Sequence, residues 1–154
     1  MKKVKFLWAT ALSLLYVVVV SFISALLVDT SSSFYLSLNK PSFMPEGVVF
    51  SICWFVVYLI LGITLTEMLV KNPKADVIVS YILLGLNNFL YLFTFFRLYS
   101  QISGLVFCIV GLIISFYIFV RLTKLKIRSS FLLLFVISWY LFASILSYNI
   151  VIIN

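Results

Sequence analysis

The segment NKPSFMPEGVVFSICWFVVY, residues 39–58, passes from a polar stretch with two prolines directly into continuous apolar sequence. Trp54 and Tyr58 are four residues apart, so they share one face if the apolar part is a helix. The whole chain has 154 residues, of which 65% are hydrophobic and 10% are charged. Soluble domains are about 45–50% apolar and about 25% charged. The sequence therefore predicts an integral membrane protein, with residues 39–58 entering the bilayer.

The apolar sequence divides into five stretches, each long enough to cross a bilayer core of about 30 Å as a helix. We place these spans at Phe6–Val28, Gly47–Val70, Val77–Phe96, Ile102–Leu122 and Phe131–Ile153. No polar stretch between them is long enough to form a second domain. The prediction is an all-α membrane protein, a five-transmembrane-helix bundle that forms a single domain over residues 1–154.

The distribution of Lys and Arg predicts the orientation of this bundle. Nine of the eleven lie on one side of the five spans and two, Lys40 and Arg97, on the other; the nine are Lys2, Lys3, Lys5, Lys71, Lys74, Arg121, Lys124, Lys126 and Arg128. Basic residues favour the cytoplasmic side, so we expect a cytoplasmic N-terminus and an outside C-terminus. The net charge of +7 then reflects topology and anionic membrane lipid, and argues against a nucleic-acid partner. A bacterial plasma membrane is the expected location.

Several kinds of chemistry are disfavoured by the residues present. The chain has no histidine, the usual ligand for zinc or haem iron and the commonest general base, so no metal site is predicted. The four carboxylates, Asp29, Glu46, Glu67 and Asp76, fall at or beyond the ends of the spans, whereas ion-coupled transporters generally carry one near the midplane. The two cysteines are isolated and are expected to be packing residues.

Polar and aromatic residues inside the spans carry the functional signal. Asn87 has Tyr91 on its face, and Trp54 and Tyr58 share a stripe with Gly62. The same spacing recurs at Trp139, Ala143 and Ser147. Asn87 either bonds a neighbouring helix or lines a polar cavity. The two tryptophans are either interface-belt residues or the walls of a site. If the three stripes face one another, they form a flat apolar slot for a planar ligand.

The fourth span carries a stripe of small residues, Gly104, Cys108, Gly111 and Ser115. Such a stripe lets another helix approach closely, either inside the bundle or across a homodimer. Both alternatives stay open on the sequence alone.

The segment KPSFMPEGVVFSICWFVVYLILG, residues 40–62, resembles the signature of the TspO/MBR family, and the register continues over residues 35–154. Matching residues are Lys40, Pro41, Pro45, Phe50, Trp54, Tyr58, Gly62, Asn87, Trp139, Phe142, Ala143 and Leu146. Departures include Phe43, Glu46, Val48 and Leu90, which mark a divergent member. Near the end of the fifth span no Lys or Arg follows Leu146 and Tyr148, so the sterol-binding pattern of animal members is not supported.

The resemblance implies five helices and a ligand of the porphyrin or haem type, with no cofactor required. The expected ligand-binding residues are Tyr35, Pro45, Trp54, Tyr58, Asn87, Tyr91, Trp139, Phe142, Ala143 and Leu146. The loop of residues 29–46 would cover the outer mouth. Three functions remain open: a tetrapyrrole sensor or carrier; an enzyme that degrades porphyrin in light with Trp54 and Trp139 as its active indoles; and, third, a small-molecule transporter.

Overall fold

The computed structural model describes residues 2–154, with side chains from Lys3 onward, as a helical bundle without strands in that range. Its elements are α1 (Lys2–Leu27), α2 (Ser33–Ser37), α3 (Gly47–Lys71), α4 (Ala75–Phe96), α5 (Gln101–Lys124), the 3-10 helix η1 (Arg128–Leu132) and α6 (Leu133–Ile153). Within the described residues, five helices are long and apolar enough to cross a membrane. They confirm the five predicted spans, with bounds that agree to about one helical turn.

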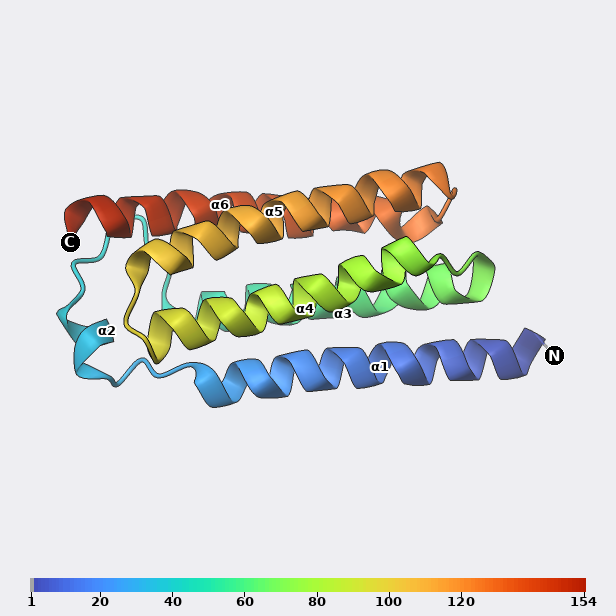
Figure 1. The fold of residues 1–154 in the computed structure, drawn as a ribbon, viewed down its shortest axis with the longest axis horizontal. Coiled ribbons are helices and arrows are strands. Elements are labelled where there is room, and N and C mark those ends of the chain that lie inside the picture. The colour runs from blue at the N-terminus through green and yellow to red at the C-terminus, as the bar shows by residue number, and fades with distance from the viewer. Residues whose placement is uncertain (1) are drawn as a thin grey trace.

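The five long helices form a closed ring. The pairs in backbone contact are α1 with α3, α3 with α6, α6 with α5, α5 with α4, and α4 with α1. The ring order therefore differs from the chain order, because α6 lies between α3 and α5. Figure 1 shows the two termini at opposite ends of the bundle, as an odd number of spans requires. The short helix α2 lies at the same end as the C-terminus (Figure 1).

The end of the bundle near the N-terminus is filled with apolar side chains. Val57, Leu61, Met68, Leu84 and Ile118 are among the residues with essentially no exposed surface there. The buried Tyr81 and the half-buried Tyr16 pack in the same core, and their hydroxyl groups find partners inside the bundle. Tyr81 shares a hydrogen bond of 2.7 Å with Thr64, and Tyr16 donates to the Tyr81 carbonyl at 2.9 Å. The interior of this half of the ring is closely packed, and a second hollow of about 480 Å³ lies between α1 and α3.

Polar contacts fix the helix ends on the N-terminal side. Glu67 is paired with Lys71 and accepts hydrogen bonds from the backbone N–H groups of Arg128 and Ser129, at 3.0 and 2.9 Å. The carboxylate thus satisfies two otherwise free donors at the start of η1. Asp76 pairs with the Arg121 guanidinium at 2.6 Å and accepts from the Tyr117 hydroxyl. All of these contacts lie at helix ends, as the positions of the carboxylates predicted.

The segment of residues 28–46, here called the lid, covers the other end. Ser32 caps α2 by accepting a hydrogen bond from the Tyr35 N–H, and Leu38 is buried against the helix ends. The lid is tied to the C-terminal residue, since Asn39 donates its N–H to Asn154 Oδ1 at 2.8 Å and Asn154 Nδ2 donates back to the Asn39 carbonyl at 3.0 Å. Lys40 lies over the Tyr35 ring, 4.2 Å from its centroid.

The small-residue stripe packs inside the bundle. A Cβ atom added at Gly104 would lie 2.9 Å from the Phe95 ring of α4, and one added at Gly111 would lie 2.3 Å from the Tyr140 ring of α6. Cys108 is buried and hydrogen-bonded to Ser147 of α6. The stripe therefore serves helix contacts within the chain, which is one of the two alternatives left open by the sequence.

The charge distribution leads to a first testable prediction about orientation. We expect a cysteine at Ser33, in the lid, to react with an impermeant maleimide added to intact cells, because Lys40 and Arg97 are the only Lys or Arg residues expected on that side. A cysteine at Lys124, near the end of α5, should react only after the cells are lysed. The unaltered chain, with Cys53 and Cys108 inside the membrane span, gives the background. Labelling of Lys124→Cys but not Ser33→Cys in intact cells would reverse the orientation.

Candidate functional site

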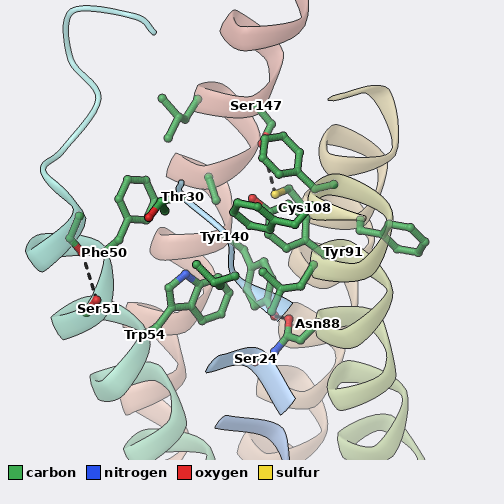
Figure 2. A pocket seen from close by; sticks show the side chains of 18 of the residues that line it. Ser24, Thr30, Phe50, Ser51, Trp54, Asn88, Tyr91, Cys108, Tyr140 and Ser147 are labelled. Carbon is green, nitrogen blue, oxygen red and sulfur yellow. Dashed lines mark hydrogen bonds between the residues drawn. The ribbon is translucent and has the colours of Figure 1, made fainter. Parts of the chain in front are cut away.

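A cavity of about 660 Å³ lies inside the half of the ring nearest the lid. Its wall is contributed by all five long helices and by the lid, as Figure 2 shows for the labelled residues. Its aromatic lining residues are Tyr35, Phe50, Trp54, Phe55, Tyr58, Tyr91, Phe95, Phe96, Phe107 and Tyr140. Small side chains at Ser24, Ala143 and Ser147 leave the space between the rings open. The volume is within the range of about 300–1,000 Å³ typical of small-molecule sites.

The α3 wall includes a stacked pair of rings, Trp54 and Tyr58. Because they are one helical turn apart, their rings stack, with centroids 5.8 Å apart and an interplanar angle of 30°. Trp54 also meets the Tyr140 ring edge to face, at 5.7 Å and 85°. The Tyr58 hydroxyl is hydrogen-bonded to Ser24 of α1 at 2.9 Å. These contacts fix the orientation of both rings, so a flat surface faces the cavity before any ligand arrives.

The α4 wall is polar at its deepest point, where Asn87 and Asn88 are both buried. Asn87 Nδ2 donates to the Phe107 carbonyl of α5 at 3.1 Å. Asn88 Oδ1 accepts from the Tyr140 hydroxyl of α6 at 2.5 Å. Asn87 therefore makes the interhelical hydrogen bond and also lines the cavity, so the two roles weighed for it from the sequence are combined.

Tyr140 links three parts of the site. Its ring rests against Gly111 of α5, its edge meets Trp54 of α3, and its hydroxyl holds Asn88 of α4. The side chain is almost fully buried. The ring can occupy this place only because Gly111 has no Cβ, since a methyl group there would overlap the ring carbon.

The structure brings seven of the ten predicted ligand residues onto the cavity wall. They are Tyr35, Trp54, Tyr58, Asn87, Tyr91, Ala143 and Leu146. Pro45, Trp139 and Phe142 are not on the wall. Pro45 lies in the lid just before α3. Met44 and Gly47, which flank it in the chain, do line the cavity.

Trp139 lies behind Trp54, which differs from the expectation that both tryptophans line one slot. The two rings meet edge to face with centroids 6.3 Å apart. Trp139 is sandwiched further by Phe142, stacked at 5.4 Å, and by Phe50, edge on at 5.6 Å. The indole is buried. The physical reason is the rotation of α6, which turns Tyr140 and Ala143 toward the cavity and Trp139 toward α3.

Several wall residues were not singled out in the sequence. Tyr140 does not belong to the spacing pattern that includes Trp139, and Asn88, next to Asn87, is expected on a different face of its helix. Phe95 and Phe96 end α4 and pack under the lid, where Phe34 meets Phe95 edge on at 5.6 Å. Only the hydrogen-bonding demand of a second buried amide could have pointed to Asn88 before the structure.

The cavity has an exposed rim between α1 and α3. Four lining residues here are also exposed: Ala25 of α1, Val28 of the lid, and Ser51 and Phe55 of α3. Three of them lie within the membrane-crossing helices, with Val28 just past the end of α1. This side of the cavity therefore has an exposed rim, and the lid bounds the cavity at its end.

The cavity has room for a flat apolar molecule, and the lack of charged groups on its wall limits the chemistry that it can perform. No charged side chain of the described residues is on the wall. Within the same residues, no group of three His, Cys, Asp or Glu side chains could hold a metal ion. The wall offers aromatic faces, hydroxyl groups and two amides, which suit stacking and hydrogen bonding.

Comparison with known proteins agrees with this architecture. The pattern of the TspO/MBR family matches residues 9–153. The chain belongs to the TspO/MBR family. It is 33% identical over 137 residues to the tryptophan-rich protein TspO of Archaeoglobus fulgidus, an alignment that covers 87% of this chain and 86% of that protein. It is 30% identical over 133 residues to the tryptophan-rich protein TspO of Chlorobaculum tepidum, covering 80% of this chain and 81% of the relative. This TspO/MBR protein is thus a multi-pass membrane protein.

Proposed function

We propose that this TspO/MBR protein binds a tetrapyrrole, a porphyrin or haem, in the cavity and acts as a sensor or carrier in the plasma membrane of a bacterium. The observation that supports this most directly is the aromatic cavity, with the stacked Trp54 and Tyr58 pair on one wall. A planar ligand would lie against these rings and exclude lipid from them. Rings held in place before binding lose little conformational freedom when the ligand arrives.

The contacts available to such a ligand are apolar and stacking contacts together with a few hydrogen bonds. The chain has no histidine, so haem iron would not be held by imidazole, and no cofactor is required for binding. The stacking contribution of one aromatic pair is about 0.5–1.5 kcal/mol beyond the area buried. Several rings around one cavity make a tetrapyrrole a better fit than a small polar solute.

A second candidate, light-dependent degradation of a bound porphyrin, is favoured by one contact. Trp54 lies on the wall and meets Trp139 edge to face at 6.3 Å. An indole beside a light-excited porphyrin can donate an electron to it. The second indole, behind the first, could then share the positive charge that is left. In this mechanism Trp54 acts on the ligand directly and Trp139 acts through Trp54.

The test of these alternatives is a titration of the purified protein in lipid nanodiscs with protoporphyrin, followed by its main absorption band. We expect saturable binding in the dark. A sensor or carrier leaves the bound spectrum unchanged under illumination, whereas degradation bleaches it faster than in protein-free nanodiscs. Counterflow of porphyrin in proteoliposomes would favour the transporter instead. Absence of saturable binding would refute the proposed function.

A further inference from the structure

The hollow between α1 and α3, here called the α1–α3 groove, lies in the half of the bundle away from the lid. Its walls are one face of α1 from Phe6 to Val17 and one face of α3 from Leu59 to Lys71. It shares no lining residue with the main cavity. At its inner end the helices approach closely, since a Cβ atom added at Gly62 would lie 3.0 Å from the Val17 side chain. Phe6 and Leu59 on its walls are at least half exposed, so the groove has an exposed rim.

The walls of the groove offer almost no free polar atoms between its two ends. Three lining residues carry hydroxyl groups, and each hydroxyl donates at 2.9 Å to the carbonyl four residues earlier in its own helix: Thr10, Ser13 and Thr66. The other lining residues are apolar, apart from Glu67 and Lys71 at the outer end. The groove is therefore suited to a long alkyl chain and not to a polar solute.

The N-terminal half of α1 is loosely held. Only 11% of the apolar window of α1 is buried inside the bundle, against 28–39% for the other four spans. Among the described residues, the side-chain hydrogen bond between Ser24 and Tyr58 is the only one that joins α1 to α3, and it lies at the opposite end of the pair. An alkyl chain in the groove would add close contacts to both helices where they have no polar link.

The outer end of the groove is positively charged. Glu67 is engaged by Lys71 and by two backbone N–H groups at the start of η1. The Lys71 side chain is 46% exposed, and its ammonium has three donors, of which Glu67 uses one. Lys3 lies one turn before the first groove residue of α1, on the same helix face, and is exposed. Lys74 follows three residues after Lys71 and is also exposed. The mouth thus suits an anionic group.

We infer that the α1–α3 groove binds an acyl chain of an anionic phospholipid, with the lipid phosphate at Lys71 and Lys3. The dimensions agree, because α1 rises about 17 Å from Phe6 to Val17 and half of the hydrocarbon core is about 15 Å deep. A second copy of the chain fits this face less well, since a parallel copy would bring two basic mouths together. The lipid site is independent of any ligand in the main cavity.

Native mass spectrometry of the purified protein in detergent tests the lipid site. Dioleoyl phosphatidylglycerol is titrated into one sample, and dioleoyl phosphatidylcholine, which has the same chains and no net charge, into another. We expect one phosphatidylglycerol per protein, with a dissociation constant at least about fivefold lower than that of phosphatidylcholine, the contribution of one basic residue near an anionic headgroup. Equal affinity for the two lipids would overturn the inference.

Lysine variants test the mouth of the groove. Lys3→Gln should weaken phosphatidylglycerol about fivefold and change phosphatidylcholine by less than about twofold. Lys71→Gln should weaken phosphatidylglycerol at least as much, because it also leaves the negative charge of Glu67 at the mouth. Lys124→Gln removes the same charge from the exposed end of α5, outside the groove, and should leave both affinities unchanged. Losses of equal size in all three variants would mean that net charge attracts the lipid and that the groove has no site for it.

A bulky variant tests the groove itself. Thr66→Phe places a ring in the groove and should weaken both lipids about tenfold or more. Thr123→Phe is its control, because Thr123 is exposed on α5 and its hydroxyl also donates to the carbonyl four residues earlier, at 2.8 Å. Lipid binding that survives in a folded Thr66→Phe protein would contradict the site, as would a dimer that this variant dissociates. The lysine variants decide the question if Thr66→Phe does not fold. Porphyrin titration is a separate readout, so failure of the lipid site leaves the proposed function standing.

Discussion

Gly111→Ala is expected to weaken porphyrin binding tenfold or more. A tenfold weakening corresponds to a loss of about 1.4 kcal/mol of binding free energy. The added methyl group would lie 2.3 Å from a ring carbon of Tyr140, so the ring has to move. Its movement breaks the hydrogen bond to Asn88 and removes the edge contact with Trp54. Overpacking of this kind costs about 1–3 kcal/mol of stability. Equilibrium binding and the melting temperature in nanodiscs measure both effects.

Gly62→Ala is the matched control for this prediction. A methyl group at Gly62 would approach only the tip of the Val17 side chain, at 3.0 Å, and Gly62 is not on the cavity wall. A side-chain tip can give way, and Ala is a better helix former than Gly. Binding by Gly62→Ala should therefore equal that of the unaltered protein. If Gly111→Ala bound porphyrin equally well, Tyr140 would not be the residue that shapes the cavity.

Trp54→Phe is expected to weaken porphyrin binding by about 1 kcal/mol or less, because the phenyl ring keeps part of the stacking contribution of an aromatic pair. Phe fills much of the same space, so the protein should remain folded. Any light-dependent degradation should fall much further than binding, because a phenyl ring cannot donate an electron as an indole does. Trp139→Phe should change binding less than Trp54→Phe, since Trp139 lies behind Trp54 and not on the wall.

Trp8→Phe is the control for both tryptophan variants. Trp8 is 68% exposed on α1 and is not on the cavity wall. We expect it to face lipid as an interface-belt residue does. Binding and bleaching rates of Trp8→Phe should match those of the unaltered protein. Equal losses in all three variants would mean that the effects come from general stability and not from a tryptophan at the site.

The fold could be predicted from the sequence because each apolar stretch is long enough for one span and is separated from the next by charges or turns. The rotation of each helix could not be predicted with the same success. In α6, the sequence LLFVISWYLFASILSYNIVII is apolar on all sides, so no amphipathic stripe shows which face points inward. The consequence is visible at Trp139, which we expected on the cavity wall and which is not on it, whereas the next residue, Tyr140, is.

The α3 wall was predictable for a different reason. Trp54 and Tyr58 share a face at a spacing of four, and their helix begins directly after the lid prolines. Their position near the mouth of the site therefore follows from local sequence. Asn88 depends instead on Tyr140, 52 residues away in the chain. A contact of that kind depends on the ring order of the helices, which places α6 beside α3 and α5.

The central claim is that a planar tetrapyrrole binds against Trp54, and a variant that retains only this tryptophan tests it most directly. In Trp8→Phe/Trp139→Phe, Trp54 is the sole tryptophan of the chain, which has three in all. Titration with protoporphyrin in nanodiscs should quench its fluorescence strongly and saturably, with one site per protein. The companion variant Trp54→Phe/Trp139→Phe, which retains only Trp8, should show the weaker quenching of a lipid-facing residue. Equal, unsaturable quenching of the two variants would contradict the account.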